Sequence, residues 1–244
     1  SLDAATHAAL QQQLGDGDKP YIIASSRLDE KKNILGIVRA YAESKALQET
    51  ARLAIFIRGV RDPFADISTL SAGEQAVLQP ILDSISAAGL RERVAFIDIR
   101  SQQALASAYR FFAARGSVFT LTAFYEPFGL APIEAAACGL AVTATRNGGP
   151  SEIFEDGSGI LVDPFDTVDI ARGLQACLAR QAELAQRGIE RVRSTYTWGR
   201  TAARYLETIE QGIAAGDSNV SLEIPQLDNR ERINQYLERD AARA

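Results

Sequence analysis

Glu126-Pro-Phe-Gly-Leu-Ala-Pro-Ile-Glu134 joins two apolar stretches of the chain. Before it, Gly116-Ser-Val-Phe-Thr-Leu-Thr122 is typical of a buried strand, and after it Ala135-Ala-Ala-Cys-Gly139 continues a helix to a glycine. The segment therefore predicts a strand, a short loop and a helix, with one glutamate in the loop and one in the helix. An open α/β sheet binds its ligand at such a place.

The rest of the chain repeats this alternation of apolar runs and helical patterns. Because the runs are uninterrupted, we expect helices on both faces of the sheet. The fold class is α/β, a doubly wound, Rossmann-like parallel sheet. The predicted strands are 20–25, 52–58, 93–98, 116–122, 140–145 and 159–162. The predicted helices begin near 34, 73, 102, 166, 183 and 198, with Ser101 and Thr197 as caps of two of them.

The domain prediction has three parts. Residues 1–19 are a linker or lead-in, residues 20–216 form the Rossmann-like domain, and residues 217–244 hold a linker followed by a charged helix. The chain contains no methionine and begins Ser1-Leu2-Asp3. We therefore expect it to be a processed product or a part of a longer protein.

The composition argues against several classes of function. The net charge of −5 disfavours a nucleic-acid partner, and no apolar run reaches the roughly 18 residues of a membrane span. The single histidine, His7, argues against a Ser-His-Asp triad and a histidine zinc site. Cys138 and Cys177 are expected as buried thiols, which fits a cytoplasmic location.

Familiar cofactor patterns are also missing from the sequence. There is no Gly-x-Gly-x-x-Gly or Walker loop, which disfavours NAD and a P-loop phosphate site. There is no Asp-x-Asp pair for a metal. We expect neither a cofactor nor a metal ion.

The loop Ser26-Arg-Leu-Asp-Glu-Lys-Lys-Asn33 follows the first predicted strand and precedes a helix. The free amides of a helix start favour an anion, so Arg27 and Lys32 could hold a diphosphate there. The alternative is a solvated charged loop, and Lys31 is expected to be solvated in either case.

Glu126 and Glu134 allow three interpretations. They could be surface and capping residues, the acid and nucleophile of a glycosidase, or carboxylates that accept hydrogen bonds from sugar hydroxyls. Gly129 favours the third, because a glycine lets the backbone approach a ligand. The turn Gly148-Gly149 could hold an anion, but a tight structural turn is the favoured interpretation.

Taken together, three segments resemble the donor-binding half of retaining GT-B glycosyltransferases, and among them the bacterial sucrose-phosphate synthases. These are Ser26–Asn33, Glu126–Glu134 and Thr145-Arg-Asn-Gly-Gly-Pro-Ser-Glu152. Weaker matches are Arg58-Gly-Val-Arg-Asp-Pro-Phe64, Leu161–Pro164 and Tyr196–Trp198. The resemblance covers about residues 20–215, one half of a GT-B architecture.

The resemblance implies a role for each matching residue. Arg27, Lys32 and Glu126 are the expected catalytic residues: the two cations stabilise the leaving diphosphate, and Glu126 positions the transferred hexose. Glu134 binds the ribose hydroxyls. The remaining donor-binding residues are Phe128, Gly129, Leu130, Ile99 (in the segment expected to hold the base) and Gly59 (in the Arg58–Phe64 match).

The implied activity is transfer of glucose from UDP-glucose, or another nucleoside diphosphate glucose, to fructose 6-phosphate with retention. The expected partners are the nucleotide sugar and a missing N-terminal acceptor domain, without which the chain should be inactive. A GT-B transferase with another donor or acceptor, a non-catalytic nucleotide-sugar-binding module and a glycosidase stay open as alternatives.

Overall fold

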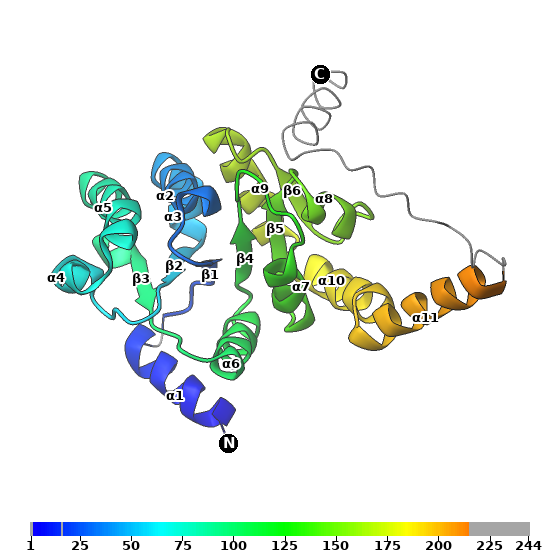
Figure 1. The fold of residues 1–244 in the computed structure, drawn as a ribbon. Coiled ribbons are helices and arrows are strands. Elements are labelled where there is room, and N and C mark those ends of the chain that lie inside the picture. Colours follow the sequence, from blue (N-terminus) through cyan, green and yellow to red (C-terminus); the bar gives the residue numbers. More distant parts are fainter. Residues whose placement is uncertain (1, 16, 215–244) are drawn as a thin grey trace, which may run out of the picture. The chain divides into compact units, whose positions relative to one another are not determined.

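The computed structural model describes residues 2–15 and 17–214 (Figure 1). Strands alternate with helices along the chain. The strands are β1 (Tyr21–Ser25), β2 (Arg52–Phe56), β3 (Val94–Ile97), β4 (Val118–Leu121), β5 (Ala141–Thr145) and β6 (Ile160–Val162). The α-helices are α1 (Leu2–Leu14), α2 (Ile34–Glu43), α3 (Lys45–Thr50), α4 (Pro63–Asp66), α5 (Ala72–Ala87), α6 (Gln102–Ala113), α7 (Leu130–Ala137), α8 (Gly149–Ile153), α9 (Thr167–Ala179), α10 (Gln181–Thr195) and α11 (Trp198–Ala214), with 3-10 turns η1 (Glu30–Lys32), η2 (Ile67–Thr69) and η3 (Arg91–Arg93).

The described strands form one parallel sheet in the order β3-β2-β1-β4-β5-β6. Each lies within its predicted range, so the six-stranded parallel sheet is confirmed. The direction of winding reverses between β1 and β4, which pair through Ile23 and Phe119 among others. This reversal is the topological switch point, where ligands bind in open α/β sheets.

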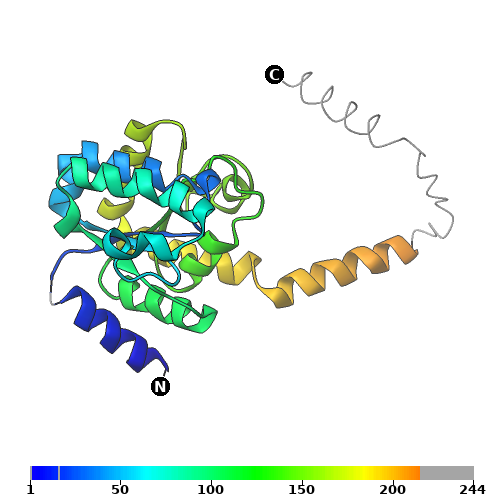
Figure 2. The same ribbon diagram turned by 60° about the vertical axis from the view of Figure 1, so that its left-hand side comes forward.

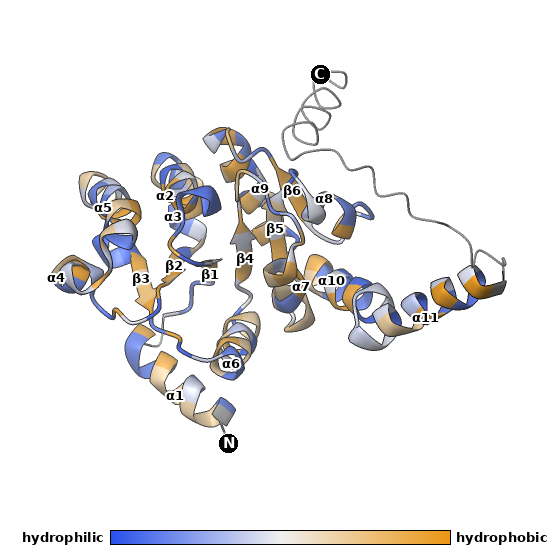
Figure 3. Ribbon diagram, viewed as in Figure 1, coloured by the Kyte–Doolittle hydropathy of each residue, from blue (hydrophilic) through white to orange (hydrophobic). Residues whose placement is uncertain are grey.

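Helices cover both faces of this sheet, as the uninterrupted apolar strands predict (Figure 2). Along β1, Ile22 packs into a core with α2, α5 and α9, whereas Ile23 packs into a second core with α6 and α7. Both side chains are fully buried, and each such burial contributes about 1.5–3 kcal/mol. Figure 3 shows much of the sheet in the orange of hydrophobic residues.

The N-terminal residues differ from the predicted linker. Residues 2–14 form helix α1, which lies beside α6. Leu10 is buried in the second core, and Gln13 Nε2 donates to the carbonyl of Phe96 at 2.7 Å. These long-range contacts make α1 a part of the folded domain rather than a linker.

The chain divides into two compact units, Ser1–Thr197 and Trp198–Ala244. The predicted domain ended at residue 216, so the structure assigns its last helix, α11, to the second unit. Within that helix Trp198, Tyr205, Ile209 and Ile213 are exposed. The predicted linker at 217–227 and helix at 228–243 lie outside the described residues.

Candidate functional site

Two loops meet at the switch point because their strands, β1 and β4, are neighbours. Asn33 joins them: its Nδ2 donates to the carbonyl of Thr122 at 3.1 Å and to that of Pro164 at 2.8 Å. The amide of Phe124 donates to the carbonyl of Lys31 at 2.9 Å. Asn33 has φ +54, a left-handed conformation that asparagine tolerates better than most residues. The Arg27–Lys32 loop is therefore tied to the Glu126 loop.

Lys32 and Glu126 form an ion pair across this junction. Lys32 Nζ lies 2.7 Å from Glu126 Oε2, and the two side chains are only 21% and 12% exposed. Glu126 Oε1 accepts a hydrogen bond from the amide of Gly129 at 3.2 Å. Burial opposes ionisation of Glu126, but the hydrogen bonds from Lys32 and Gly129 and the lysine charge together lower its pKa. Glu126 is thus a fixed carboxylate that accepts hydrogen bonds.

The turn at Gly148 and Gly149 holds the backbone of Glu126 in place. The Glu126 amide donates to the carbonyl of Asn147 at 3.0 Å, and the Gly149 amide donates to the carbonyl of Glu126 at 2.8 Å. Gly148 has φ +98, and a Cβ there would lie 2.2 Å from the carbonyl oxygen of Glu126. The glycines are therefore required by the close approach of two backbones, in agreement with the favoured structural interpretation.

Helix α7 carries the second glutamate, Glu134. It begins directly after Gly129, whose φ is +85. A Cβ on Gly129 would lie 2.7 Å from Ile153 Cδ1, so that methyl group would have to move, and the positive φ would strain any other residue there. Phe128 and Leu130, on either side of this glycine, have exposed side chains. The helix then places Glu134 one turn after Leu130.

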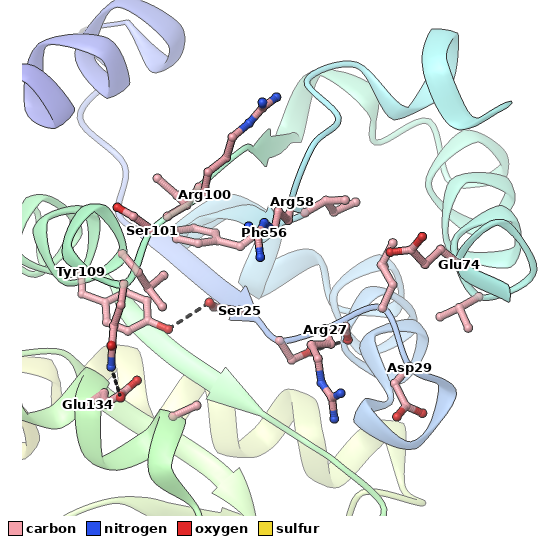
Figure 4. A pocket seen from close by; sticks show the side chains of 18 of the residues that line it. Ser25, Arg27, Asp29, Phe56, Arg58, Glu74, Arg100, Ser101, Tyr109 and Glu134 are labelled. Carbon is pink, nitrogen blue, oxygen red and sulfur yellow. Dashed lines mark hydrogen bonds between the residues drawn. The ribbon is translucent and has the colours of Figure 1, made fainter. Parts of the chain in front are cut away.

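All of the sequence-predicted site residues except Gly129 and Gly59 line two neighbouring cavities at the carboxyl edge of the sheet. The larger cavity, of about 910 Å³, includes Arg27, Ile99 and Glu134 in its lining (Figure 4). The smaller, of about 250 Å³, is lined by Ser25, Ser26, Arg27, Lys32, Leu121, Glu126, Phe128, Leu130 and Ala131. Arg27 lines both cavities, as do Ser25, Ser26 and Ala131.

Gly59 is not among the residues that line these two cavities. Its amide donates to Asp98 Oδ1 at 2.7 Å, and Arg100 Nε donates to Asp98 Oδ2 at 2.9 Å. Desolvation opposes ionisation of Asp98, but these hydrogen bonds and the arginine charge lower its pKa. The Asp98 carboxylate thereby holds the Gly59 loop beside the loop that contains Ile99. A donor-binding role of Gly59 stays a prediction.

Helix α6 contributes residues that the sequence analysis did not assign as side-chain groups. Gln102, Leu105 and Tyr109 line the larger cavity from one face of this helix. Gln102 Nε2 donates to Glu134 Oε1 at 3.2 Å, and the Tyr109 hydroxyl donates to Ser25 Oγ at 2.9 Å (Figure 4). Burial raises the pKa of Tyr109, so its hydroxyl stays protonated. The i, i+3, i+7 spacing of these three residues is the signal that could have indicated them.

Ser101 fixes the start of this helix. Its side chain accepts a hydrogen bond from the Ala104 amide at 3.1 Å, which confirms the predicted cap.

Within residues 2–15 and 17–214, no cluster of three or more His, Cys, Asp or Glu residues could hold a metal ion. No helix in that part of the chain is both long and apolar enough to cross a membrane.

The fold and the cavities together define a Rossmann-like domain with a candidate ligand site at its switch point. Its cations suit an anionic group, and its carboxylates suit hydroxyl groups. The family described as Glycosyl transferases group 1 matches residues 7–195, and the chain belongs to this family.

Curated relatives agree with this family and are much longer than the chain. Sucrose-phosphate synthase of Zea mays is 38% identical over 206 residues, which cover 83% of this chain and 19% of that protein. Probable sucrose-phosphate synthase 1 of Oryza sativa subsp. indica is 39% identical, with 83% of this chain and 18% of that protein covered. The chain therefore spans about a fifth of the length of these relatives.

Solved structures show the same fold. Sucrose-phosphate synthase from Thermosynechococcus elongatus superposes with a TM-score of 0.66 at 27% identity, over 87% of this chain and 49% of that one. Anabaena HepE in complex with UDP-glucose superposes with a TM-score of 0.67 at 22% identity, over 85% of this chain and 53% of that one. The likeness to HepE shows the fold alone. The Rossmann-like fold expected from the GT-B resemblance is confirmed.

Proposed function

We propose that the chain is the donor-binding part of a retaining glycosyltransferase that transfers glucose from UDP-glucose to fructose 6-phosphate. The observation that carries this proposal is the position of Arg27, a cation that lines both cavities. Glu134 lies in one of these cavities, and the Lys32–Glu126 pair lies in the other. A nucleoside diphosphate sugar has the matching order of hydroxyl-bearing ribose, diphosphate and hexose.

The proposed pose puts each part of the donor against groups of suitable chemistry. The nucleoside occupies the larger cavity with its ribose at Glu134, and the diphosphate lies at Arg27 and Lys32. The hexose occupies the smaller cavity. There its hydroxyl groups donate hydrogen bonds to Glu126 and form hydrogen bonds with the backbone of Phe128, Gly129 and Leu130. Charge-assisted hydrogen bonds of this kind contribute about 1.5–3 kcal/mol each.

The reaction places negative charge where the cations are. The bond between glucose C1 and the β-phosphate oxygen breaks, and UDP leaves with the electron pair. The acceptor hydroxyl oxygen then bonds to C1 on the same face, and its proton is released. Arg27 and Lys32 stabilise the charge that grows on the diphosphate, a contribution that is often large in enzymes.

The state of Glu126 argues against its use as the acid of a glycosidase. A glycosidase acid needs a raised pKa so that it holds a proton at neutral pH. The pKa of Glu126 is lowered instead, and its oxygens face Lys32 and the Gly129 amide. Glu126 therefore suits hydroxyl binding better than proton donation.

The lengths of the relatives support a further part of the proposal. The chain matches about half of the Thermosynechococcus enzyme and a fifth of the plant enzymes. We propose that the fructose 6-phosphate site lies in a second domain, and that residues 1–244 alone bind UDP but transfer no glucose. Formation of sucrose 6-phosphate by residues 1–244 alone would contradict this part.

Calorimetry with UDP tests the donor site. We expect binding that Arg27→Ala and Glu134→Ala weaken by about tenfold or more each, which corresponds to 1.4 kcal/mol or more. Lys31→Ala is the matched control, because Lys31 is an exposed neighbour on the same loop and lines neither cavity. No heat at millimolar UDP, or equal effects of all three substitutions, would refute the donor site.

Donor and acceptor profiling of the longer protein tests the rest. The proposal expects UDP-glucose and fructose 6-phosphate to be preferred. Preference for another pair would indicate a different transferase of the same family. A protein that binds the donor but transfers to no acceptor would be a non-catalytic binding module.

A further inference from the structure

Helix α6 forms one wall of the larger cavity. Its side chains form hydrogen bonds with the end of β1 and with helix α7. Gln102 is the first residue of α6, and its side-chain amide donates to Glu134 Oε1 on α7 at 3.2 Å. One turn and two turns further on, Leu105 and Tyr109 face the same cavity. Tyr109 is buried and bonds to Ser25 at the end of β1. Figure 4 shows both hydrogen bonds in the same cavity.

We propose that Gln102 is a positioning residue that orients the Glu134 carboxylate toward the ribose and so selects ribonucleotides over 2′-deoxyribonucleotides. This inference rests on the proposed function, in which Glu134 receives the ribose hydroxyls. Nothing in that function requires Gln102, whose side chain acts on the ligand only through Glu134.

The geometry explains why an uncharged hydrogen-bond donor is suited to orienting the Glu134 carboxylate. The Gln102 amide occupies Oε1 of Glu134 and leaves Oε2 to accept hydrogen bonds from vicinal hydroxyls. A carboxylate held on one side loses less rotamer freedom when the ligand binds. A lysine or arginine in place of Gln102 would compete with the hydroxyls for both oxygens, whereas a glutamine occupies one and keeps the negative charge.

The position of Gln102 is itself fixed by the fold. The Ser101 hydroxyl caps α6, which sets the direction of the first helical turn. The buried Tyr109 anchors the same helix face two turns later. Gln102 is therefore carried by a rigid element, which is what a specificity contact requires.

Calorimetry with UDP and 2′-deoxy-UDP on residues 1–244 tests the inference. The wild type should prefer UDP. Gln102→Ala should weaken UDP binding by about five- to tenfold, a loss within the range of one ordinary hydrogen bond, because Gln102 acts on the ligand only through Glu134. Binding of 2′-deoxy-UDP should change by less than about twofold, so the preference for UDP should fall. Gln103→Ala is the matched control, because the exposed Gln103 is the next residue of the helix and does not line the cavity.

The Glu134→Gln background separates positioning from a general structural effect. In that background Gln102→Ala should leave the ratio of the two affinities unchanged, because the carboxylate is gone. Circular dichroism and thermal unfolding check that each variant is folded. An unfolded Gln102→Ala variant would refute a positioning role by showing a structural one.

The outcomes distinguish this inference from the proposed function. If the wild type binds no UDP, both the proposed function and the inference that rests on it are refuted. If the wild type binds UDP but equally well with 2′-deoxy-UDP, or if Gln102→Ala lowers both affinities by the same factor, only the inference fails.

Discussion

Lys32 Nζ lies 2.7 Å from Glu126 Oε2, although 94 positions separate the two residues in the chain. The ion pair connects the loop after β1 to the loop after β4. It holds a cation and a carboxylate side by side, an arrangement that the proposed binding of a diphosphate next to a hexose requires.

Lys32→Ala should lower the free energy of unfolding by about 1–3 kcal/mol, because it leaves the largely buried Glu126 carboxylate without its charged partner. UDP affinity should fall by about tenfold or more. Urea denaturation and calorimetry measure the two effects. Lys31→Ala, with an exposed side chain on the same loop, should change neither by much; equal losses in both variants would contradict a specific ion pair.

Glu126 should make stability depend on pH in the acid range. Its pKa is lowered in the folded chain relative to the unfolded one. Its contribution is therefore complete above the ordinary glutamate pKa of about 4.3 and is lost as the pH falls through the folded value. The difference in unfolding free energy between wild type and Glu126→Gln should be constant from pH 7 to about 5 and then shrink. A difference that grows on acidification would show the opposite sign.

Gly148→Ala should destabilise the chain more than Gly89→Ala. Both glycines have positive φ, +98 and +65, so both substitutions strain the backbone by about 1 kcal/mol or more. Only at Gly148 would the new Cβ meet another atom, the Glu126 carbonyl oxygen at 2.2 Å, while at Gly89 nothing lies within 4 Å. The difference in thermal stability between the two variants should thus report the cost of the clash apart from that of the backbone strain. Gly148→Ala should also weaken UDP binding, because the Glu126 loop must move.

Asn33→Ala should cost about 2–4 kcal/mol of stability. It removes the Nδ2 hydrogen bonds to Thr122 and Pro164 and the Oδ1 contact with the Gly36 amide, and it places alanine at φ +54. Asn33→Gly removes the same hydrogen bonds without the backbone strain, so it should be less damaging by about 1 kcal/mol. Equal losses in urea denaturation would mean that the left-handed conformation carries no cost here.

The two cysteines should differ in reactivity. Burial raises the pKa of Cys177 to about 12, and burial also raises the pKa of the half-buried Cys138. Since the thiolate is the reactive form, a thiol reagent at pH 8 should label Cys138 slowly and Cys177 only after unfolding. Mass spectrometry after timed labelling identifies the modified residue. Rapid labelling of Cys177 in the native state would show that α9 opens readily.

Local patterns were enough to predict the strands and the loops that carry the site. Each apolar run is long enough for a buried strand, and the polar residues that follow it stand at the carboxyl edge of any parallel sheet. This is why Arg27, Lys32, Glu126 and Glu134 could be proposed before the structure. The same reasoning missed the packing of residues 2–14, because the contacts of Leu10 and Gln13 are made with distant segments.

The amino-acid sequence alone thus established the alternation of strands and helices and the kinds of side chain available for a ligand. The tertiary structure decided which of these side chains meet. The strand order places β1 beside β4, and only this order brings Lys32 to Glu126. Likewise, the packing of α6 near α7 brings Gln102 to Glu134. A local pattern reports on neighbours within one element, whereas these contacts depend on the arrangement of elements far apart in the chain.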